Sequence, residues 1–176
     1  MAGKNFIPFP VLQTERLTLR QLLSSDDTEI LALRSNENVN KYLGRKPARS
    51  LDDAKNFIRT IQENTRQNTS IYWAITMNGA DKLMGTICLF DFSDENAKAE
   101  IGFELLPGYQ GKGIMQEAAS KVIAFAFQHL GLHSIDACTH FENLSSVQLL
   151  ERLNFERQGV VDNLLLFRCL LGKLKS

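Results

Sequence analysis

The sequence predicts one α/β domain built around a mixed, mostly antiparallel sheet. Three strand patterns follow one another over residues 71–106 with only short polar turns between them, which is typical of an antiparallel meander. A helical pattern over 115–130 then leads into a strand pattern at 134–139, and this order implies a right-handed parallel crossover. No repeat, low-complexity tract or linker divides residues 1–176, so we expect a single domain with helices flanking the sheet.

Composition narrows the class of protein. Of the 176 residues, 44% are apolar and 23% are charged, as in ordinary globular domains. The 20 Lys and Arg residues balance the 20 Asp and Glu residues, and this zero net charge predicts no nucleic-acid partner. Apolar runs such as 122–127 are far shorter than the roughly 18 residues of a membrane span, so no membrane partner is expected. The sequence does not start with a basic, apolar leader, which predicts a cytoplasmic location.

Cysteine and histidine spacing predicts no metal site. The three cysteines, Cys88, Cys138 and Cys169, are widely separated and form no CxxC pair, so we expect small core residues rather than disulfides or zinc ligands. The histidines show no HExxH spacing, and structural roles are expected for them. They are His129, His133 and His140.

The N-terminal third predicts one strand and two helices. Residues 16–20 alternate with period two and predict the strand. Over 26–34 the spacing becomes helical, with acidic residues in the first turn, where the helix dipole favours them. Ser50 is expected to cap the second helix, because acidic residues and an apolar stripe follow it. That stripe consists of Phe57, Ile58 and Ile61. The segment between the two helices, 35–49, is polar.

The rest of the chain supplies the meander, the crossover and a closing hairpin. The meander strands are predicted over 71–77, 82–92 and 98–106. The crossover helix over 115–130 is expected to bury one face and to stop at Gly131. Its buried face consists of Met115, Ala119, Val122, Ala126 and Leu130. After the strand at 134–139, the patterns predict a helix over 145–153 and strands over 156–161 and 164–171.

A glycine-rich loop joins the third meander strand to the crossover helix. Residues 107–115 read Pro-Gly-Tyr-Gln-Gly-Lys-Gly-Ile-Met. At such a junction the first backbone N–H groups of the helix have no intrahelical partner, and the helix dipole adds positive charge, so the loop predicts an anion site. A nucleoside triphosphatase loop is excluded, because Gly113 rather than Ser or Thr follows Lys112. The dinucleotide fingerprint fails at Gln116, where it needs glycine.

A third phosphate-binding pattern fits this loop. It reads Gln/Arg-x-x-Gly-x-Gly/Ala and matches residues 110–115 except at Met115. Together with 14–20, 99–103 and Asn143-x-x-Ser146 followed by Glu-Arg-Leu-Asn-Phe at 151–155, it resembles the GNAT superfamily of acetyl-coenzyme A dependent N-acetyltransferases. More narrowly, the chain is similar to the branch that includes the ribosomal-protein N-terminal acetyltransferases.

The resemblance implies a cofactor site and an expected reaction. Acetyl-coenzyme A would be the acetyl donor, without a metal, and one backbone N–H, that of Leu105, would polarise the thioester carbonyl. The implied cofactor-binding residues are Leu105, Leu106, Gln110, Gly111, Lys112, Gly113, Ile114, Met115 and Asn143. Asn154 replaces the glycine that normally ends the late helix, and asparagine is the next most tolerant residue there.

The expected catalytic groups are less specific. By the resemblance, Leu150 occupies the place where many members carry a tyrosine that acts as the general acid. Ser146 is therefore the candidate general acid, with Asn143 binding the pantetheine or a water. Helix capping is the alternative role for this pair. Glu104 and Glu100 lie on one strand face and are the candidates for the base. Glu104 comes first because it is nearer to the glycine-rich loop. A solvated or salt-bridged carboxylate, with water serving as the base, remains open.

Three kinds of function remain open at the level of sequence. The first is direct acetyl transfer to a primary amine, such as a protein or peptide N-terminus. The second is the same transfer to an antibiotic, a polyamine or an amino acid, and the third is a noncatalytic acyl-coenzyme A binding module. By the resemblance, segments 35–49 and 162–163 would form the acceptor walls. A homodimer also remains open at the level of sequence.

Overall fold

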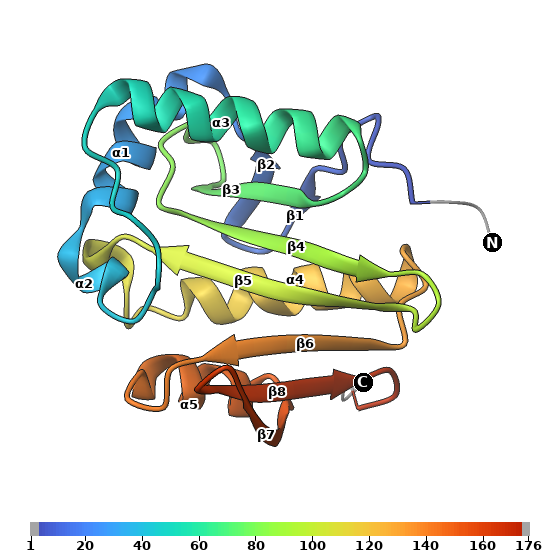
Figure 1. Cartoon of the computed structure of the whole chain (residues 1–176). Helices are drawn as coiled ribbons and strands as arrows, with labels where there is room; N and C mark the ends of the chain where they lie inside the picture. Colours follow the sequence, from blue (N-terminus) through green and yellow to red (C-terminus); the bar gives the residue numbers. More distant parts are fainter. Residues whose placement is uncertain (1–3, 174–176) are drawn as a thin grey trace.

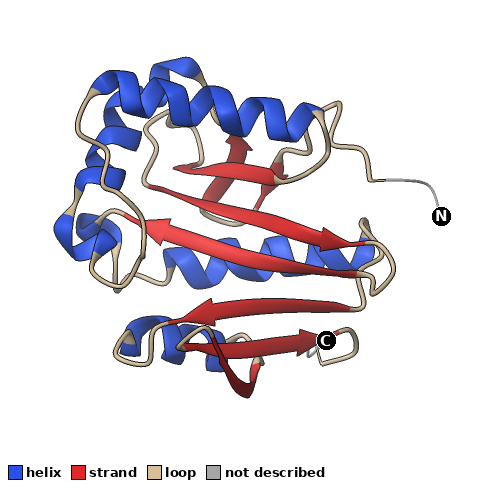
Figure 2. Cartoon of the chain, in the orientation of Figure 1, coloured by secondary structure: helices blue, strands red, loops and turns tan. Residues whose placement is uncertain are grey.

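The structure, a computed structural model, describes residues 4–173 and shows one eight-stranded sheet flanked by helices (Figures 1 and 2). The strand order is β1-β2-β3-β4-β5-β6-β8-β7, and every neighbouring pair is antiparallel except β5 and β6. The predicted mixed, mostly antiparallel α/β sheet is therefore confirmed, as is its parallel crossover. The ends of the predicted domain, residues 1–3 and 174–176, lie outside the described residues.

The element bounds agree closely with the sequence patterns. The strands are β1 Leu12–Gln13, β2 Leu17–Gln21, β3 Ile71–Met77, β4 Gly85–Ser93, β5 Lys98–Leu105, β6 Ser134–Thr139, β7 Glu156–Val161 and β8 Leu164–Leu170. The helices are α1 Asp27–Ser35, α2 Glu37–Asn40, α3 Leu51–Arg66, α4 Ile114–Gln128 and α5 Leu144–Arg152. Short 3-10 turns cover Ser24–Asp26 and Pro107–Tyr109.

Two short elements, β1 and α2, were not expected from the sequence. Both are too short to show a periodic pattern. The Ser50 cap is confirmed, since its side chain accepts the N–H of Asp53. The second meander strand begins at Gly85 rather than at Lys82, and α4 ends at Gln128 rather than at Leu130.

The two faces of the sheet carry different helices (Figure 1). The larger core packs the odd-numbered residues of β3, Ile71, Trp73 and Ile75, together with residues of α4 and α5. The opposite face packs Ala74 with residues of α1 and α3. Because successive side chains of a strand point to opposite faces, each residue of β5 can be assigned to one of the two. The glutamates of β5 share the α1 and α3 side with Ala74.

The parallel pair β5 and β6 is only partly joined. Its register covers three pairs, which are Lys98 with Ser134, Ala99 with Ile135 and Glu100 with Asp136. Beyond these, β5 continues to Leu105 and β6 to Thr139, and the strands diverge toward their carboxyl ends (Figure 1). We call this divergence the splay. It leaves backbone groups of both strands free of a ladder partner in the middle of the sheet.

Candidate functional site

The glycine-rich loop places an exposed helix N-terminus beside the splay. Gly111 and Gly113 have φ of 74° and 75°, the left-handed region in which a residue with a side chain costs roughly 1–2 kcal/mol. Gly113 is the N-cap residue of α4, so the free N–H groups of the first turn follow it directly. Residues 110–113 are exposed, which leaves this positive end open to an anion.

The side chains after the loop face the core. Ile114 and Met115 are buried, so these two residues can offer a ligand only their backbone. The departure of Met115 from the glycine or alanine of the pattern therefore leaves the N–H groups unchanged. Gln110 uses its side chain locally, because its Nε2 donates to the carbonyl of Leu105 over 2.8 Å.

A set of contacts that sequence reasoning missed fixes this loop to the start of β2. The carboxylate of Glu117, in the first turn of α4, accepts hydrogen bonds from Thr14 Oγ1 at 2.6 Å and from Arg16 Nε at 2.6 Å. Arg16 Nη1 also donates to the carbonyl of Lys112 at 3.1 Å. Burial opposes the charge of Glu117, but the bonds from Thr14 and Arg16 outweigh it and lower its pKa. The only signal of these contacts was the sequence Thr-Glu-Arg before the first strand.

The splay exposes the N–H of Leu105. The next residue, Leu106, donates its N–H to the carbonyl of Met84 over 2.9 Å, on the side of β4. Because N–H directions alternate along a strand, the N–H of Leu105 points to the other side, toward β6. A donor of this kind can polarise a carbonyl oxygen that enters the splay.

The late helix α5 begins with the predicted capping residues. Asn143 is the N-cap residue, and its Oδ1 accepts the backbone N–H of Ser146 at 3.3 Å and the hydroxyl of Ser145 at 3.1 Å. The capping role considered for Asn143 is thus present. The half-buried Ser146 keeps its hydroxyl outside these contacts. Leu150 is buried in the core.

The two candidate bases have different surroundings. Both carboxylate oxygens of Glu104 accept hydrogen bonds from the Arg45 guanidinium, one of them at 3.0 Å, which leaves this carboxylate poorly placed to take a proton. Glu100 belongs to the last residue pair that joins β5 and β6 before the splay. Burial first, and then the charges of Asp91 and Asp136, raise the pKa of Glu100, while the neighbouring Cys138 thiol acts in the opposite direction.

The segment between α1 and α3 folds over the same face. Arg45 Nε donates to Asn40 Oδ1 at 2.8 Å, which fixes the segment next to Glu104. Tyr42 stacks on His140, the residue after β6, with ring centroids 5.4 Å apart. The predicted acceptor wall at 35–49 thus reaches across the open end of the splay.

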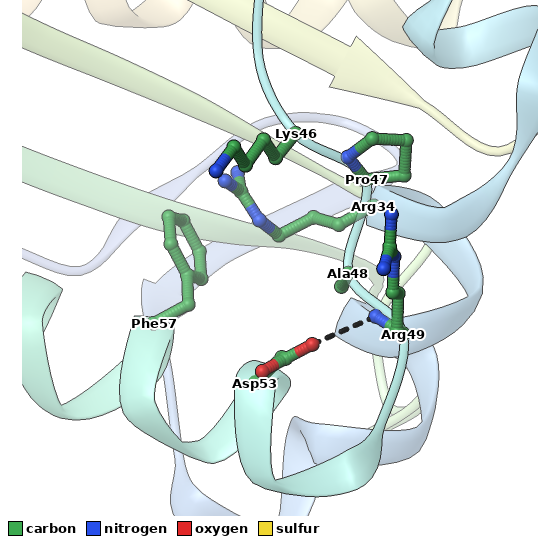
Figure 3. Close-up of a pocket in the computed structure, with 7 residues that line it drawn as sticks. All are labelled: Arg34, Lys46, Pro47, Ala48, Arg49, Asp53 and Phe57. Carbon is green, nitrogen blue, oxygen red and sulfur yellow. Dashed lines mark hydrogen bonds between the residues drawn. The ribbon is translucent and has the colours of Figure 1, made fainter.

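A pocket of about 420 Å³ adjoins this segment (Figure 3). It is lined by Arg34, Lys46, Pro47, Ala48, Arg49, Asp53 and Phe57. Lys46 and Arg49 lie in the segment 35–49 that was expected to form an acceptor wall, whereas Arg34, in the last turn of α1, was expected only as part of a helix.

The remaining cysteines and histidines form no second site. Cys88 and Cys169 are buried, as expected of core residues, and Cys138 is half-buried. Burial raises the pKa of Cys138 to about 11, so this thiol is mostly protonated near neutral pH. Within residues 4–173 the structure shows no cluster of three His, Cys, Asp or Glu side chains that could hold a metal ion. In the same range, no helix is both long enough and apolar enough to cross a membrane.

Comparison with known proteins gives the family. The model of the acetyltransferase (GNAT) domain matches residues 16–156. The uncharacterised N-acetyltransferase YoaA of Bacillus subtilis (strain 168) is 34% identical over 153 residues, which cover 87% of this chain and 86% of YoaA. The spermidine N(1)-acetyltransferase of Vibrio cholerae serotype O1 is 26% identical over 145 residues, covering 82% of this chain and 81% of that enzyme.

Solved structures share the fold. RimL, a ribosomal L7/L12 alpha-N-protein acetyltransferase solved in complex with coenzyme A, superposes with a TM-score of 0.81 at 15% identity, covering 92% of this chain and 98% of RimL. The ribosomal-protein-S5-alanine acetyltransferase of Vibrio fischeri gives a TM-score of 0.77 at 23% identity, covering 95% of this chain and all of that one. The family match includes β2, the splay, the glycine-rich loop and α5. This chain therefore belongs to the GNAT family of N-acetyltransferases.

Proposed function

We propose that this protein transfers the acetyl group of acetyl-coenzyme A directly to a primary amine, with a protein or peptide N-terminus as the acceptor. The observation that supports this most is the splay, which opens beside a glycine-capped helix N-terminus. A long thin ligand with phosphates at one end can lie along these two features at once. The family match supports the same reaction.

The residues present fit such a donor. The exposed glycines and the positive end of α4 suit a pyrophosphate, with Lys112 adding a positive charge, and the unpaired backbone of the splay suits an amide-bearing arm. Bound here, acetyl-coenzyme A supplies an activated acetyl group as a thioester. Leu105, Leu106, residues 110–115 and Asn143 are the proposed contacts, most of them through their backbone.

Each catalytic step is assigned to one group of this chain. The N–H of Leu105 polarises the carbonyl that is attacked. The carboxylate of Glu100 takes a proton from the incoming amine, because its raised pKa suits a base better than the Arg45-bound Glu104. The hydroxyl of Ser146 donates a proton to the departing sulfur and regains one from water, so that the coenzyme leaves as a thiol. In this arrangement Glu104 positions the acceptor wall through Arg45.

The charge of the acceptor wall favours a peptide over a polyamine. Over 35–49 and 162–163 the cations Lys41, Arg45, Lys46 and Arg49 outnumber the acids Glu37 and Asp162, and no acidic residue occurs over 41–49. A polycationic acceptor would meet repulsion here. This separates the proposal from the activity named for the Vibrio cholerae spermidine relative.

The experiment follows thiol release from acetyl-coenzyme A in the presence of four acceptors. These are a short peptide with a free N-terminus, the same peptide with a blocked N-terminus, spermidine and a free amino acid. We expect release with the free peptide and none with the blocked one. Binding of acetyl-coenzyme A by calorimetry without turnover on any amine would instead indicate a noncatalytic module, and faster turnover of spermidine would overturn the peptide assignment.

A further inference from the structure

The pocket beside the acceptor wall carries an excess of positive charge. Arg34, Lys46 and Arg49 line it, against the single carboxylate of Asp53. None of the three cationic side chains forms an ion pair within the described part of the chain, residues 4–173. Asp53 is already engaged, because its Oδ2 accepts the backbone N–H of Arg49 at 2.8 Å (Figure 3). The pocket therefore keeps a net positive charge, three cations against one carboxylate.

Arg34 is the most buried of these cations, since Lys46 and Arg49 are exposed. Its guanidinium stacks on the ring of Phe57 at 3.9 Å, and its side chain makes no hydrogen bond to any other described residue. Burial first, and then the nearby charge of Arg45, lower its pKa. The charge of Glu104 acts in the opposite direction, but both of its oxygens bond Arg45, so it forms no ion pair with Arg34. A half-buried guanidinium without a counter-ion costs free energy that a bound anion would recover.

The pocket and the proposed acceptor site share one segment of the chain. Lys46 and Arg49 follow Arg45 on the same segment, and Arg45 binds Glu104, the residue before Leu105. Figure 3 shows the Arg34 side chain extending from α1 toward Phe57 on α3, below the segment that carries Lys46. This segment offers a path from Leu105 toward the pocket for the rest of an acceptor molecule.

We propose that the pocket around Arg34, Lys46 and Arg49 binds a carboxylate of the acceptor, so that the enzyme prefers amines that carry an acidic group some residues away. The inference rests on the proposed function and names its substrate class. A planar guanidinium and a carboxylate can form two parallel hydrogen bonds, and two further cations add to the attraction.

The test compares acidic peptides with their amide counterparts. Short peptides with a free N-terminus and an amidated carboxyl end carry Glu, or Gln in its place, at the second, third or fourth position. One further Gln peptide keeps its free terminal carboxylate, which separates side-chain from terminal carboxylates as the recognised group. We expect about a tenfold higher kcat/KM for the acidic member of at least one pair, since charge-assisted hydrogen bonds are worth at least that factor.

A pair of double variants assigns the preference to the pocket. Lys46→Gln with Arg49→Gln removes two exposed pocket charges, and Lys82→Gln with Lys121→Gln removes two exposed charges elsewhere. We expect the first variant to reduce the acidic preference several-fold, because only Arg34 remains to attract the carboxylate, and the second to retain it. The same ratio in both variants, or no preference in the unmodified protein, would overturn the proposal.

Direct binding separates this inference from the catalytic proposal. The fluorescence anisotropy of the labelled Glu and Gln peptides, with the label at the carboxyl end, measures binding without turnover. Tighter binding of the Glu peptide that disappears in the pocket variant supports the anion site even if no acetyl transfer occurs. Equal binding of both peptides counts against the site whether or not the enzyme turns over.

Discussion

At the scale of single residues, two glutamates on one strand face carry different chemistry because of what surrounds them. Glu104 is held by a guanidinium at both oxygens, whereas Glu100 is half-buried at the root of the splay with acidic neighbours. The sequence placed both on one face and ranked Glu104 first, but its contacts with Arg45 now favour Glu100. The ranking depends on Arg45, which lies 59 residues away in sequence.

Replacement of the base should alter the pH profile. A base acts when deprotonated, so the rate rises with pH through the raised pKa of Glu100. We expect Glu100→Gln to lower kcat/KM on the order of a hundredfold and to remove this acidic limb. Glu104→Gln should keep the limb and raise the KM of the acceptor. The measurement is kcat/KM between pH 5 and 9, and an intact limb in Glu100→Gln contradicts the assignment.

Replacement of the acid should separate turnover from binding. Ser146→Ala keeps the backbone N–H that Asn143 caps, so helix α5 is preserved. We expect kcat to fall about tenfold or more while the affinity for coenzyme A, measured by calorimetry, changes little. Ser145→Ala is the matched control, because it is the exposed neighbour that bonds Asn143. Equal kcat for the two variants would remove Ser146 from the mechanism.

At the scale of elements, the start of helix α4 shows how a backbone conformation creates a binding surface. The sequence predicted this helix, its loop and its positive end. The left-handed conformation of Gly113 and the contacts of Glu117 with β2 became evident only in the fold. They hold the first turn so that its free N–H groups are presented together.

A side chain at the N-cap position should weaken cofactor binding. Gly113→Ala forces a residue with a Cβ into the left-handed region, at a cost of roughly 1–2 kcal/mol, and the loop is expected to relax away from its binding conformation. We expect about tenfold weaker binding of coenzyme A by calorimetry. Gly108→Ala, with open space around its Cβ and no positive φ, should bind as the unmodified protein does. Equal affinities of the two variants would exclude the loop as the phosphate site.

At the scale of the whole molecule, one charged cluster joins three strands at the closed end of the splay. Asp136 on β6 accepts hydrogen bonds from Arg168 on β8, at 2.6 and 2.9 Å, and lies 3.2 Å from the ammonium of Lys98 on β5. Burial opposes this charge, but the bonds from Arg168 and Lys98 outweigh it and lower the pKa of Asp136. The cluster holds the strands together just before they diverge.

Loss of this cluster should make stability depend less on pH. Because the folded pKa of Asp136 lies below its unfolded value, its contribution is complete above about pH 4 and is lost as the pH falls through the folded pKa. We expect Asp136→Asn to lower the free energy of unfolding by about 2 kcal/mol at neutral pH, and by less in acid. Urea denaturation measures this, with the exposed Asp81→Asn as control. A constant difference across the pH range would contradict the account.

The sequence by itself determined the order of the longer elements, the parallel crossover and the position of the glycine-rich loop, because periodicity, capping residues and glycine spacing are local properties of the chain. Only the tertiary structure decided that Arg45 bonds the carboxylate of Glu104 and that Glu100 lies at the root of the splay. It also decided that Arg34 lines a pocket without forming an ion pair with another described residue. These facts depend on contacts between residues far apart in sequence. Charge and burial act through space, so the chemistry of the site follows from the fold. The position of the glycine-rich loop, in contrast, could be predicted from the sequence.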